Sequence, residues 1–366
     1  MKVVTYVGTY TDATHTGIHI LETDTETGAF RPVGRVDGIE NATYLARSRA
    51  RPVLYAAHGL SAFGPPARGG AIAAYRISGA TVTLLNRKPV GVTVPCHVAL
   101  DPSETALAFA EYTHAVSGVF ELNPDGSLAD TPPVTTTHVG SGPDASRQKR
   151  AHAHCATVTP DGQFLCIADL GMDRVIMYDW TGRQHGLTPV AHLTITTAGG
   201  AGPRHFVFHP NGRFAFLLNE LNNTLTTYRY TGEAFIPLHT HRTLPPDFHG
   251  FSKAAALKCS ADGRRLLASN RGHDSIAAFD VDPDSGRLEL LAISPLLGAS
   301  PRDFAWVPGE AFILAGHEHS NTVCSYAYDA ATGRLEPAGD PYSVHRPVCI
   351  VFAPPLATPD PFRNAI

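Results

Sequence analysis

Thr159-Pro-Asp-Gly-Gln-Phe-Leu-Cys-Ile-Ala-Asp169 is the stretch that decides the fold, because the chain repeats its pattern. It joins a Pro-Asp-Gly turn to a polar residue and then to a short apolar strand that ends on a polar side chain. Clear copies stand at His209–Asn219 and Ser260–Asn270, and degenerate copies stand at Arg51–His58, Asp101–Glu111 and Val307–His317. Turns that recur at a spacing of about 50 residues are typical of a repeat architecture.

Each unit also carries further strand patterns. An alternating stretch follows the polar residue, as in Arg174–Asp179, Thr224–Tyr230 and Ser275–Val281, and an outer-strand pattern comes next, as in Asp282–Leu290 and Asp329–Leu335. Four short strands per repeat are typical of a propeller blade. When the strand at Tyr6–Thr9 is counted as the start of another unit, the chain holds seven units. The sequence therefore predicts an all-β, seven-bladed β-propeller with four antiparallel strands per blade.

The two ends of the chain are predicted to share one blade. Met1–Phe30 begins part-way through a blade, and Pro347–Phe352 has the pattern of the strand that this blade lacks. Pairing of the two segments would leave no open sheet edge and would close the ring without a covalent link. We expect residues 1–366 to form a single domain, with the Pro-rich stretch 353–366 as a tail on its surface.

The composition excludes several classes of protein. The 366 residues carry a formal net charge of −4, without the concentrated basic face that a nucleic-acid partner requires. We interpret the one small basic cluster, Arg147, Lys149 and Arg150, first as a solvated loop and second as an anion-steering patch. The N-terminus alternates directly into a strand, and no apolar stretch follows that could form a signal peptide or a membrane span.

The cysteines and histidines indicate neither a disulfide scaffold nor a metal protein. The six cysteines are scattered without a CxxC pair, which favours a reducing, cytoplasmic location. The pairs His152-x-His154 and His317-x-His319 have a spacing found in metal sites, but 19 histidines produce such pairs by chance and no HExxH motif accompanies them. We therefore expect no cofactor and no catalytic metal.

Alignment of the repeats on their turns sorts the polar side chains by position. Six places before the turn proline, or its equivalent, stand His154, Arg204 and Arg302. Nine places after it stand His58, Glu111, Asp169, Asn219, Asn270 and His317, and one place further stand Tyr112, Glu220, Arg271 and Glu318. Because successive strands of a blade are antiparallel, all these positions lie at the same end of the blades. A single Asn or Asp there is best interpreted as a strand cap, whereas the whole set predicts an anion-binding, acid–base site.

Several longer motifs carry a family resemblance. The most specific are Gly199-Gly-Ala-Gly-Pro-Arg-His-Phe-Val-Phe-His-Pro-Asn-Gly212 and Leu218-Asn-Glu-Leu-Asn-Asn-Thr224, supported by His152–His154, Ser269–Ser275 and Pro301–Phe304. Over nearly its whole length the chain resembles the propeller lactonases, which include the bacterial propeller-type 6-phosphogluconolactonases and the 3-carboxy-cis,cis-muconate lactonising enzymes. The resemblance implies four catalytic residues, His154, Arg204, Glu220 and Arg271. The repeat places the same four residues at one end of the blades.

The resemblance also implies lactone chemistry. Lactone hydrolysis needs a base that deprotonates water and positive donors where the carbonyl oxygen gains charge. Either Glu220 or His154 can be the base, and the arginines can bind a substrate anion or the developing oxyanion. We expect substrate-binding roles for Arg302, His152, Asp169 and Glu318.

Three functions remain open at this stage. The leading hypothesis is hydrolysis of 6-phospho-D-glucono-1,5-lactone to 6-phosphogluconate, and the same residue types also suit the cyclisation of 3-carboxymuconate. The third is a non-catalytic scaffold, although charge rather than apolar surface gathers at the predicted mouth. We expect a small anionic lactone or carboxylate as partner, no nucleic acid or membrane, and a monomer or weak homo-oligomer. The loops Ala62–Gly70, Ser141–Arg150 and His317–His319 are candidates for varying the rim and hence the substrate.

Overall fold

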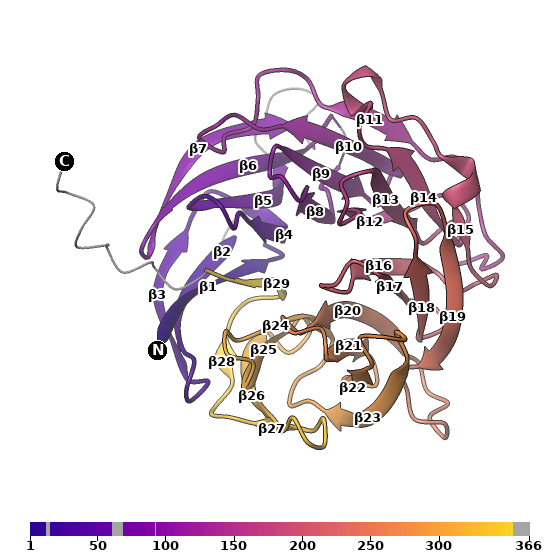
Figure 1. Ribbon diagram of the computed structural model, residues 1–366. Helices are drawn as coiled ribbons and strands as arrows, with labels where there is room; N and C mark the ends of the chain where they lie inside the picture. The colour runs from indigo at the N-terminus through magenta and orange to yellow at the C-terminus, as the bar shows by residue number, and fades with distance from the viewer. Residues whose placement is uncertain (12–14, 61–68, 92, 354–366) are drawn as a thin grey trace, which may run out of the picture.

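A ring of seven antiparallel sheets surrounds a central channel (Figure 1). The computed structural model describes residues 1–11, 15–60, 69–91 and 93–353. Six of the sheets have four strands, and the seventh has a short additional strand. The prediction of a seven-bladed β-propeller is confirmed. The rest of the predicted tail, residues 354–366, and most of the loop Ala62–Gly70 lie outside the described residues.

The strands are numbered along the chain, and within each blade they follow one another from the channel outward. Blade 1 consists of β29 (Pro347–Phe352), β1 (Lys2–Thr9), β2 (Ile18–Asp24) and β3 (Phe30–Val36). Blade 2 consists of β4 (Glu40–Arg47), β5 (Val53–Leu60), β6 (Gly69–Ser78) and β7 (Thr81–Pro89). Blade 3 consists of β8 (His97–Leu100), β9 (Ala106–Glu111), β10 (Val116–Glu121) and β11 (Val134–Thr137). Blades 4 and 5 consist of β12 (Ala153–Val158), β13 (Phe164–Asp169), β14 (Arg174–Asp179) and β15 (Ile195–Thr196); and β16 (Pro203–Phe208), β17 (Phe214–Asn219), β18 (Thr224–Tyr230) and β19 (Phe235–Arg242). Blades 6 and 7 consist of β20 (Lys253–Cys259), β21 (Arg265–Arg271), β22 (Ser275–Val281) and β23 (Leu288–Pro295); and β24 (Pro301–Trp306), β25 (Phe312–His317), β26 (Thr322–Tyr328) and β27 (Leu335–Pro337), with β28 (Tyr342–Ser343) also on β26.

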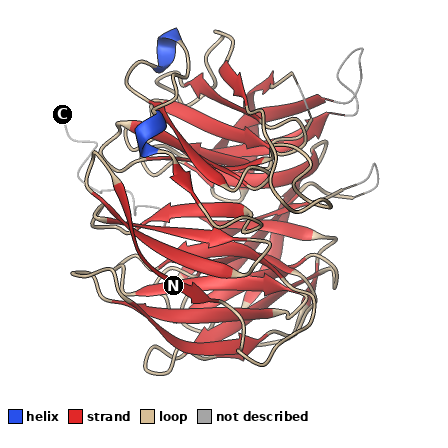
Figure 2. Ribbon diagram, turned by 90° about the vertical axis from the view of Figure 1, so that its right-hand side faces the viewer, coloured by secondary structure: helices blue, strands red, loops and turns tan. Residues whose placement is uncertain are grey.

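Strand makes up almost all of the regular structure (Figure 2). The described residues contain two short 3-10 helices, η1 (Arg183–His185) and η2 (Ala191–Leu193), between β14 and β15. None of the described helices is long and apolar enough to cross a membrane. All six cysteines are among the described residues, and none is in a disulfide.

The repeated turn has a local physical cause. In the turn before β13, the N–H of Gly162 donates to the carbonyl oxygen of Thr159 at 2.8 Å, and the Thr159 hydroxyl donates to Asp161 at 2.5 Å. Gly162 has φ of 68°, a backbone conformation that glycine adopts without steric cost. The turn therefore ends the inner strand and starts the second strand at a fixed position in each blade.

The hydrophobic core lies between neighbouring blades. In one cluster, Phe216 and Leu218 of blade 5 pack with Leu257, Leu266 and Phe279 of blade 6, and all five are buried. Each sheet is therefore apolar on both faces, and each is covered on both sides by the next blade in the ring. The inner strands contact one another in sequence around the channel, so their first residues surround a common mouth.

The predicted ring closure is present. β29 pairs with β1 in antiparallel register, with Tyr6 opposite Val351 and Val7 opposite Ile350. Figure 1 shows the yellow β29 beside the indigo β1, on the channel side of blade 1. The strand made from the end of the chain thus supplies the innermost position of the blade that the N-terminus begins.

Candidate active site

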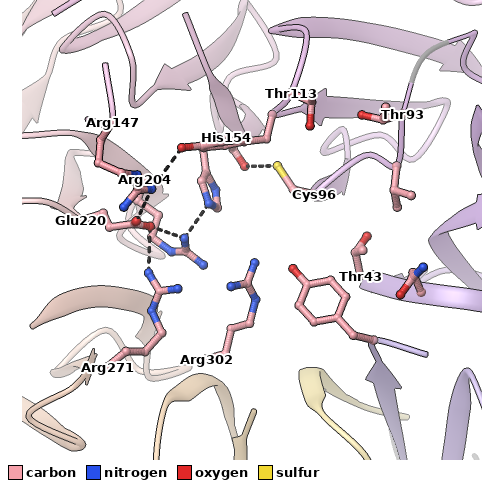
Figure 3. Close-up of a pocket in the computed structure, with 14 residues that line it drawn as sticks. Thr43, Thr93, Cys96, Thr113, Arg147, His154, Arg204, Glu220, Arg271 and Arg302 are labelled. Carbon is pink, nitrogen blue, oxygen red and sulfur yellow. Dashed lines mark hydrogen bonds and ion pairs between the residues drawn. The ribbon is translucent and has the colours of Figure 1, made fainter. Parts of the chain in front are cut away.

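A cavity of about 580 Å³ lies at the end of the channel where the inner strands begin. This volume is typical of sites for small molecules. The side chains around this cavity come from strands of blades 2, 4, 5, 6 and 7 and from connecting loops (Figure 3). They are Tyr10, Asn41, Thr43, Thr93, Val94, Cys96, Tyr112, Thr113, Arg147, His154, Arg204, Glu220, Arg271 and Arg302. The four predicted catalytic residues, together with Arg302, therefore lie around one cavity.

Three of these side chains stand at β-bulges. His154, Arg204 and Arg302 are each the second residue of an inner strand, β12, β16 and β24 respectively. In all three strands the register with the next strand shifts across this residue, which is left without a residue opposite it. A bulge re-aims a side chain and is common beside active sites. The repeated bulge explains why the same offset brings three different side chains into one cavity.

The two offsets after the turn have different roles. Asp169, nine places after its turn, ends β13 and accepts the N–H groups of Gly171 at 3.0 Å and Met172 at 3.1 Å. The capping interpretation therefore holds for Asp169. One place further along the repeat, Tyr112, Glu220 and Arg271 line the cavity, whereas Leu170 is buried in the core and Glu318 lines a neighbouring cavity.

Three predicted substrate-binding residues lie outside the cavity lining. Asp169 also accepts a hydrogen bond from the buried His138 at 2.7 Å. His152 stacks on the Tyr112 ring, with 4.2 Å between the ring centroids. Glu318 contacts Arg302 and Arg346 and lines a neighbouring cavity.

Glu220 is the carboxylate on which the arginines converge. Its Oε2 accepts from Arg204 and lies 2.9 Å from Arg271 Nη2, and its Oε1 accepts from Arg147 Nη2 at 2.9 Å. Burial alone raises the pKa of the Glu220 carboxyl, but the charges of Arg271, Arg204 and Arg147 outweigh burial and hold the pKa well below its usual range. Glu220 is therefore ionised at neutral pH, and both of its oxygens are occupied.

His154 is a neutral imidazole beside this cluster. Its Nε2 lies 2.6 Å from Arg204 Nη1, and because a guanidinium only donates, Nε2 is the acceptor and the ring proton is on Nδ1. Burial, reinforced by the charge of Arg204, lowers the pKa of His154 well below its ordinary value. Nδ1 is buried and has no hydrogen-bond partner among the described residues.

Arg147 was missed as a site residue. It lies in the loop between β11 and β12, and its Nη2 donates to Glu220 at 2.9 Å and to the Tyr112 hydroxyl at 3.1 Å. The neighbouring Gln148 is buried and fixes the loop by donating to the Leu170 carbonyl oxygen at 2.8 Å. The solvated-loop interpretation is therefore wrong for Arg147, although Lys149 and Arg150 are exposed. Arg147 stands at none of the repeated offsets, so its polar loop was the only signal in the sequence.

The cavity has two chemically different walls. Figure 3 shows Arg147, Arg204, Arg271 and Arg302 on one side and threonines on the other. The Thr43 hydroxyl donates to the Pro95 carbonyl oxygen at 2.5 Å, and the Thr93 hydroxyl donates to Glu111, so both keep lone pairs that can accept from a ligand. A cationic wall facing a hydroxyl wall suits a polyhydroxylated molecule with an electron-rich or anionic group.

The described residues contain no group of three or more His, Cys, Asp or Glu side chains placed to hold a metal ion. What the cavity does offer is an imidazole with a lone pair, an ionised carboxylate and several guanidinium groups. These groups can move a proton and stabilise a developing oxyanion.

Comparison with known proteins agrees with this fold. The family model described as "Lactonase, 7-bladed beta-propeller" matches residues 4–352. A 6-phosphogluconolactonase of Bacillus subtilis is 34% identical over 355 residues, which cover 96% of this chain and 98% of that protein. A periplasmic gluconolactonase of Pseudomonas aeruginosa has a similar solved structure, with a TM-score of 0.88, 29% identity, and coverage of 97% of this chain and 99% of that one. A putative 6-phosphogluconolactonase of Bacteroides fragilis gives a TM-score of 0.86 at 28% identity, over 96% of this chain and 98% of that one.

Proposed function

This chain belongs to the seven-bladed β-propeller lactonase family, and on that premise we propose that it hydrolyses 6-phospho-D-glucono-1,5-lactone to 6-phosphogluconate. One observation carries the proposal: the residues of a single cavity combine a neutral imidazole with unused arginine donors. Arg147 Nη1 and Arg271 Nε are buried N–H groups that have no hydrogen-bond partner among the described residues. A cavity with surplus donors and a proton acceptor suits the attack of water on a lactone carbonyl.

We assign the base to His154. Glu220 is a poor base because both of its oxygens are occupied by arginines. His154 is unprotonated at Nε2, which accepts only from Arg204. When a substrate draws Arg204 toward the carbonyl oxygen, Nε2 becomes free to accept a proton from water. Glu220 then acts as a positioning residue that holds the arginines in place.

The hydrolysis can be written as a balanced sequence. Water gives a proton to His154 Nε2 as its oxygen bonds to the carbonyl carbon, and Arg204 and Arg271 stabilise the resulting oxyanion. Collapse of this intermediate breaks the bond between the carbonyl carbon and the ring oxygen. The ring oxygen takes the proton from His154, which leaves an open-chain acid and a neutral imidazole. The hydroxyls of Thr43 and Thr93 accept from the sugar hydroxyls on the opposite wall.

The proposal includes a cytoplasmic location. Six cysteines without a disulfide suit a reducing compartment, and a phosphorylated sugar lactone is an intracellular type of substrate.

A direct assay tests the proposal. Purified protein is given 6-phosphogluconolactone, unphosphorylated gluconolactone and 3-carboxymuconate, with spontaneous lactone hydrolysis subtracted. We expect the lactones to turn over, and Arg204→Ala and Glu220→Gln to lose at least about 100-fold in kcat/KM, because each removes a charged hydrogen bond in the site. Arg213→Ala, which removes an exposed arginine of the turn between β16 and β17 that does not line the cavity, is the control and should keep full activity. Full activity in both site variants would overturn the site, and turnover of the muconate alone would overturn hydrolysis.

A further inference from the structure

Arg302 differs from the other arginines of the cavity. Arg147, Arg204 and Arg271 all contact Glu220, whereas the guanidinium of Arg302 makes no hydrogen bond to any residue that the structure describes (Figure 3). Its nearest ion-pair partner is Glu318, at 3.5 Å, and only 18% of its side chain is exposed. A guanidinium has five N–H donors, so this half-buried arginine has unused capacity to bind an anion.

The surroundings hold Arg302 in place without neutralising it. Its guanidinium carbon lies 5.1 Å from the centroid of the Tyr10 ring, and that of Arg346 lies 4.9 Å from the same ring. Glu318 accepts from Arg346 at 2.6 Å, so its charge is shared by two arginines. Burial lowers the pKa of Arg302, but the nearby Tyr10 and Glu318 outweigh burial, and the pKa is raised overall. Arg302 is therefore a fixed, charged donor.

A second cavity of about 420 Å³ adjoins the central one between blades 6 and 7. Arg271 and Arg302 line both cavities, and Lys253 lines the second but not the central one. The ammonium of Lys253 lies 5.0 Å from the centroid of the Phe251 ring and makes no hydrogen bond to a described residue. The side cavity thus contains two cations without hydrogen-bond partners among the described residues.

The two carboxylates in the side cavity are already engaged. Asp274 accepts the N–H groups of Gly272 at 3.0 Å and Ser300 at 2.7 Å, and Glu318 is bonded to Arg346. The side cavity is lined by three cations, Lys253, Arg271 and Arg302, and two carboxylates, so positive charge is in excess there. A lactone carbonyl has no formal charge and needs only the donors beside His154, so the excess charge favours a ligand with a second, anionic group.

We propose that the side cavity, through Arg302 and Lys253, is a phosphate subsite that binds the phosphate monoester of a substrate whose lactone ring lies in the central cavity. This inference rests on the proposed function and deepens it by stating how phosphorylated and unphosphorylated lactones are distinguished. Tyr10 and Glu318 are positioning residues for Arg302. The phosphate gains the planar fork of an arginine on one side and the compact charge of a lysine on the other.

The test compares two substrates in four proteins. kcat/KM for 6-phosphogluconolactone and for gluconolactone is measured in wild type, Arg302→Gln, Lys253→Gln and the exposed-lysine control Lys149→Gln. We expect Arg302→Gln to lose roughly 20- to 200-fold on the phosphorylated lactone, mostly in KM, and Lys253→Gln to lose roughly 5- to 20-fold. Both variants should lose less on gluconolactone than on the phosphorylated lactone, and Lys149→Gln should be unchanged on either. Equal losses on the two substrates, or no loss, would overturn the subsite.

A binding measurement separates this inference from the proposed function. Calorimetry with 6-phosphogluconate and with gluconate requires no turnover, and unchanged thermal melting shows that each variant is folded. The subsite predicts tighter binding of the phosphorylated acid by wild type and loss of that preference in Arg302→Gln. An absence of lactone turnover alongside this preference would overturn the proposed reaction and leave the subsite supported. Lactone turnover without this preference would overturn the subsite and leave the proposed reaction supported.

Discussion

At the scale of single residues, Arg147 reaches Glu220 from a loop outside the repeated blade pattern. It supplies the bond to Oε1, while Arg204 and Arg271 occupy Oε2. The carboxylate is thus held from two sides, and each arginine is oriented by the same group. A network of this kind loses more than one pairwise interaction when a member is removed.

We predict that Arg147→Met lowers kcat/KM roughly 10- to 100-fold on the best lactone substrate, because Glu220 loses a charged hydrogen bond and its fixed orientation. The matched controls are Lys149→Met and Arg150→Met, which change exposed cations of the same loop. The measurement is a steady-state assay of all three variants. Equal activity in the Arg147 and Lys149 variants would show that Arg147 is not part of the site.

The pH dependence follows from the neutral state of His154. The proposed base is active when unprotonated, and its pKa lies well below the ordinary value because of burial and Arg204. Activity should therefore persist as the pH falls from 8 to 6, without an inflection near 6.5. Gluconolactone is the substrate for this profile, because a phosphate group titrates near pH 6 itself. A fall in kcat/KM centred on pH 6.5 would contradict the assignment.

At the scale of elements, the ends of the second strands β13 and β17 show one structural position and one functional position. Asp169 ends β13 and takes hydrogen bonds from the backbone of the following turn and from His138. Glu220 follows the end of β17 by one residue and faces the cavity. A difference of one place along the repeat therefore changes a strand cap into a site residue.

We predict that Asp169→Asn lowers the free energy of unfolding by about 2–3 kcal/mol, because an amide nitrogen replaces an acceptor among buried donors. kcat/KM should stay within about 3-fold of wild type, since Asp169 does not line the cavity. Urea unfolding and a steady-state assay measure the two effects, with the largely exposed Asp284→Asn as control. Unchanged stability together with a raised KM would instead assign Asp169 to substrate binding.

Much of this element-scale structure is predictable from the sequence, because the signals are local and repeated. The alternating stretches at Arg174–Asp179, Thr224–Tyr230 and Ser275–Val281 coincide with β14, β18 and β22. What the sequence hides depends on three-dimensional neighbours. The repeat shows no pairing between Glu220 and Arg147, and the stacking of Arg302 on Tyr10 joins residues brought together only by closure of the ring.

At the scale of the whole molecule, buried histidines make stability depend on pH. Burial lowers the pKa of His58 and His317 to about 4 and that of His97 to about 3. Between pH 6.5 and these values the unfolded chain binds protons that the folded chain excludes. Stability is therefore complete above pH 6.5 and falls as the pH decreases below it.

We predict that the free energy of unfolding falls by several kcal/mol between pH 6.5 and pH 5, with each such histidine contributing about 1.4 kcal/mol per pH unit. Urea unfolding at half-unit pH steps gives the slope. His58→Gln should reduce that slope by about 1.4 kcal/mol per pH unit, whatever its effect on stability at pH 7. A free energy of unfolding that is constant over this range would contradict the prediction.

The position of β29 has a consequence for how the protein is made. A translating ribosome must reach at least residue 352 before blade 1 can receive its inner strand, so nascent chains carry an open β1 edge until nearly all blades exist. The backbone N–H of Tyr10 donates to the carbonyl oxygen of Arg346 at 3.0 Å. This hydrogen bond of Tyr10 therefore also forms only after residue 346 has been synthesised. A chain whose synthesis stops before β29 would therefore contain most of the catalytic residues but could not form the closed ring. Activity in this architecture therefore reports that the chain has been made at least as far as β29.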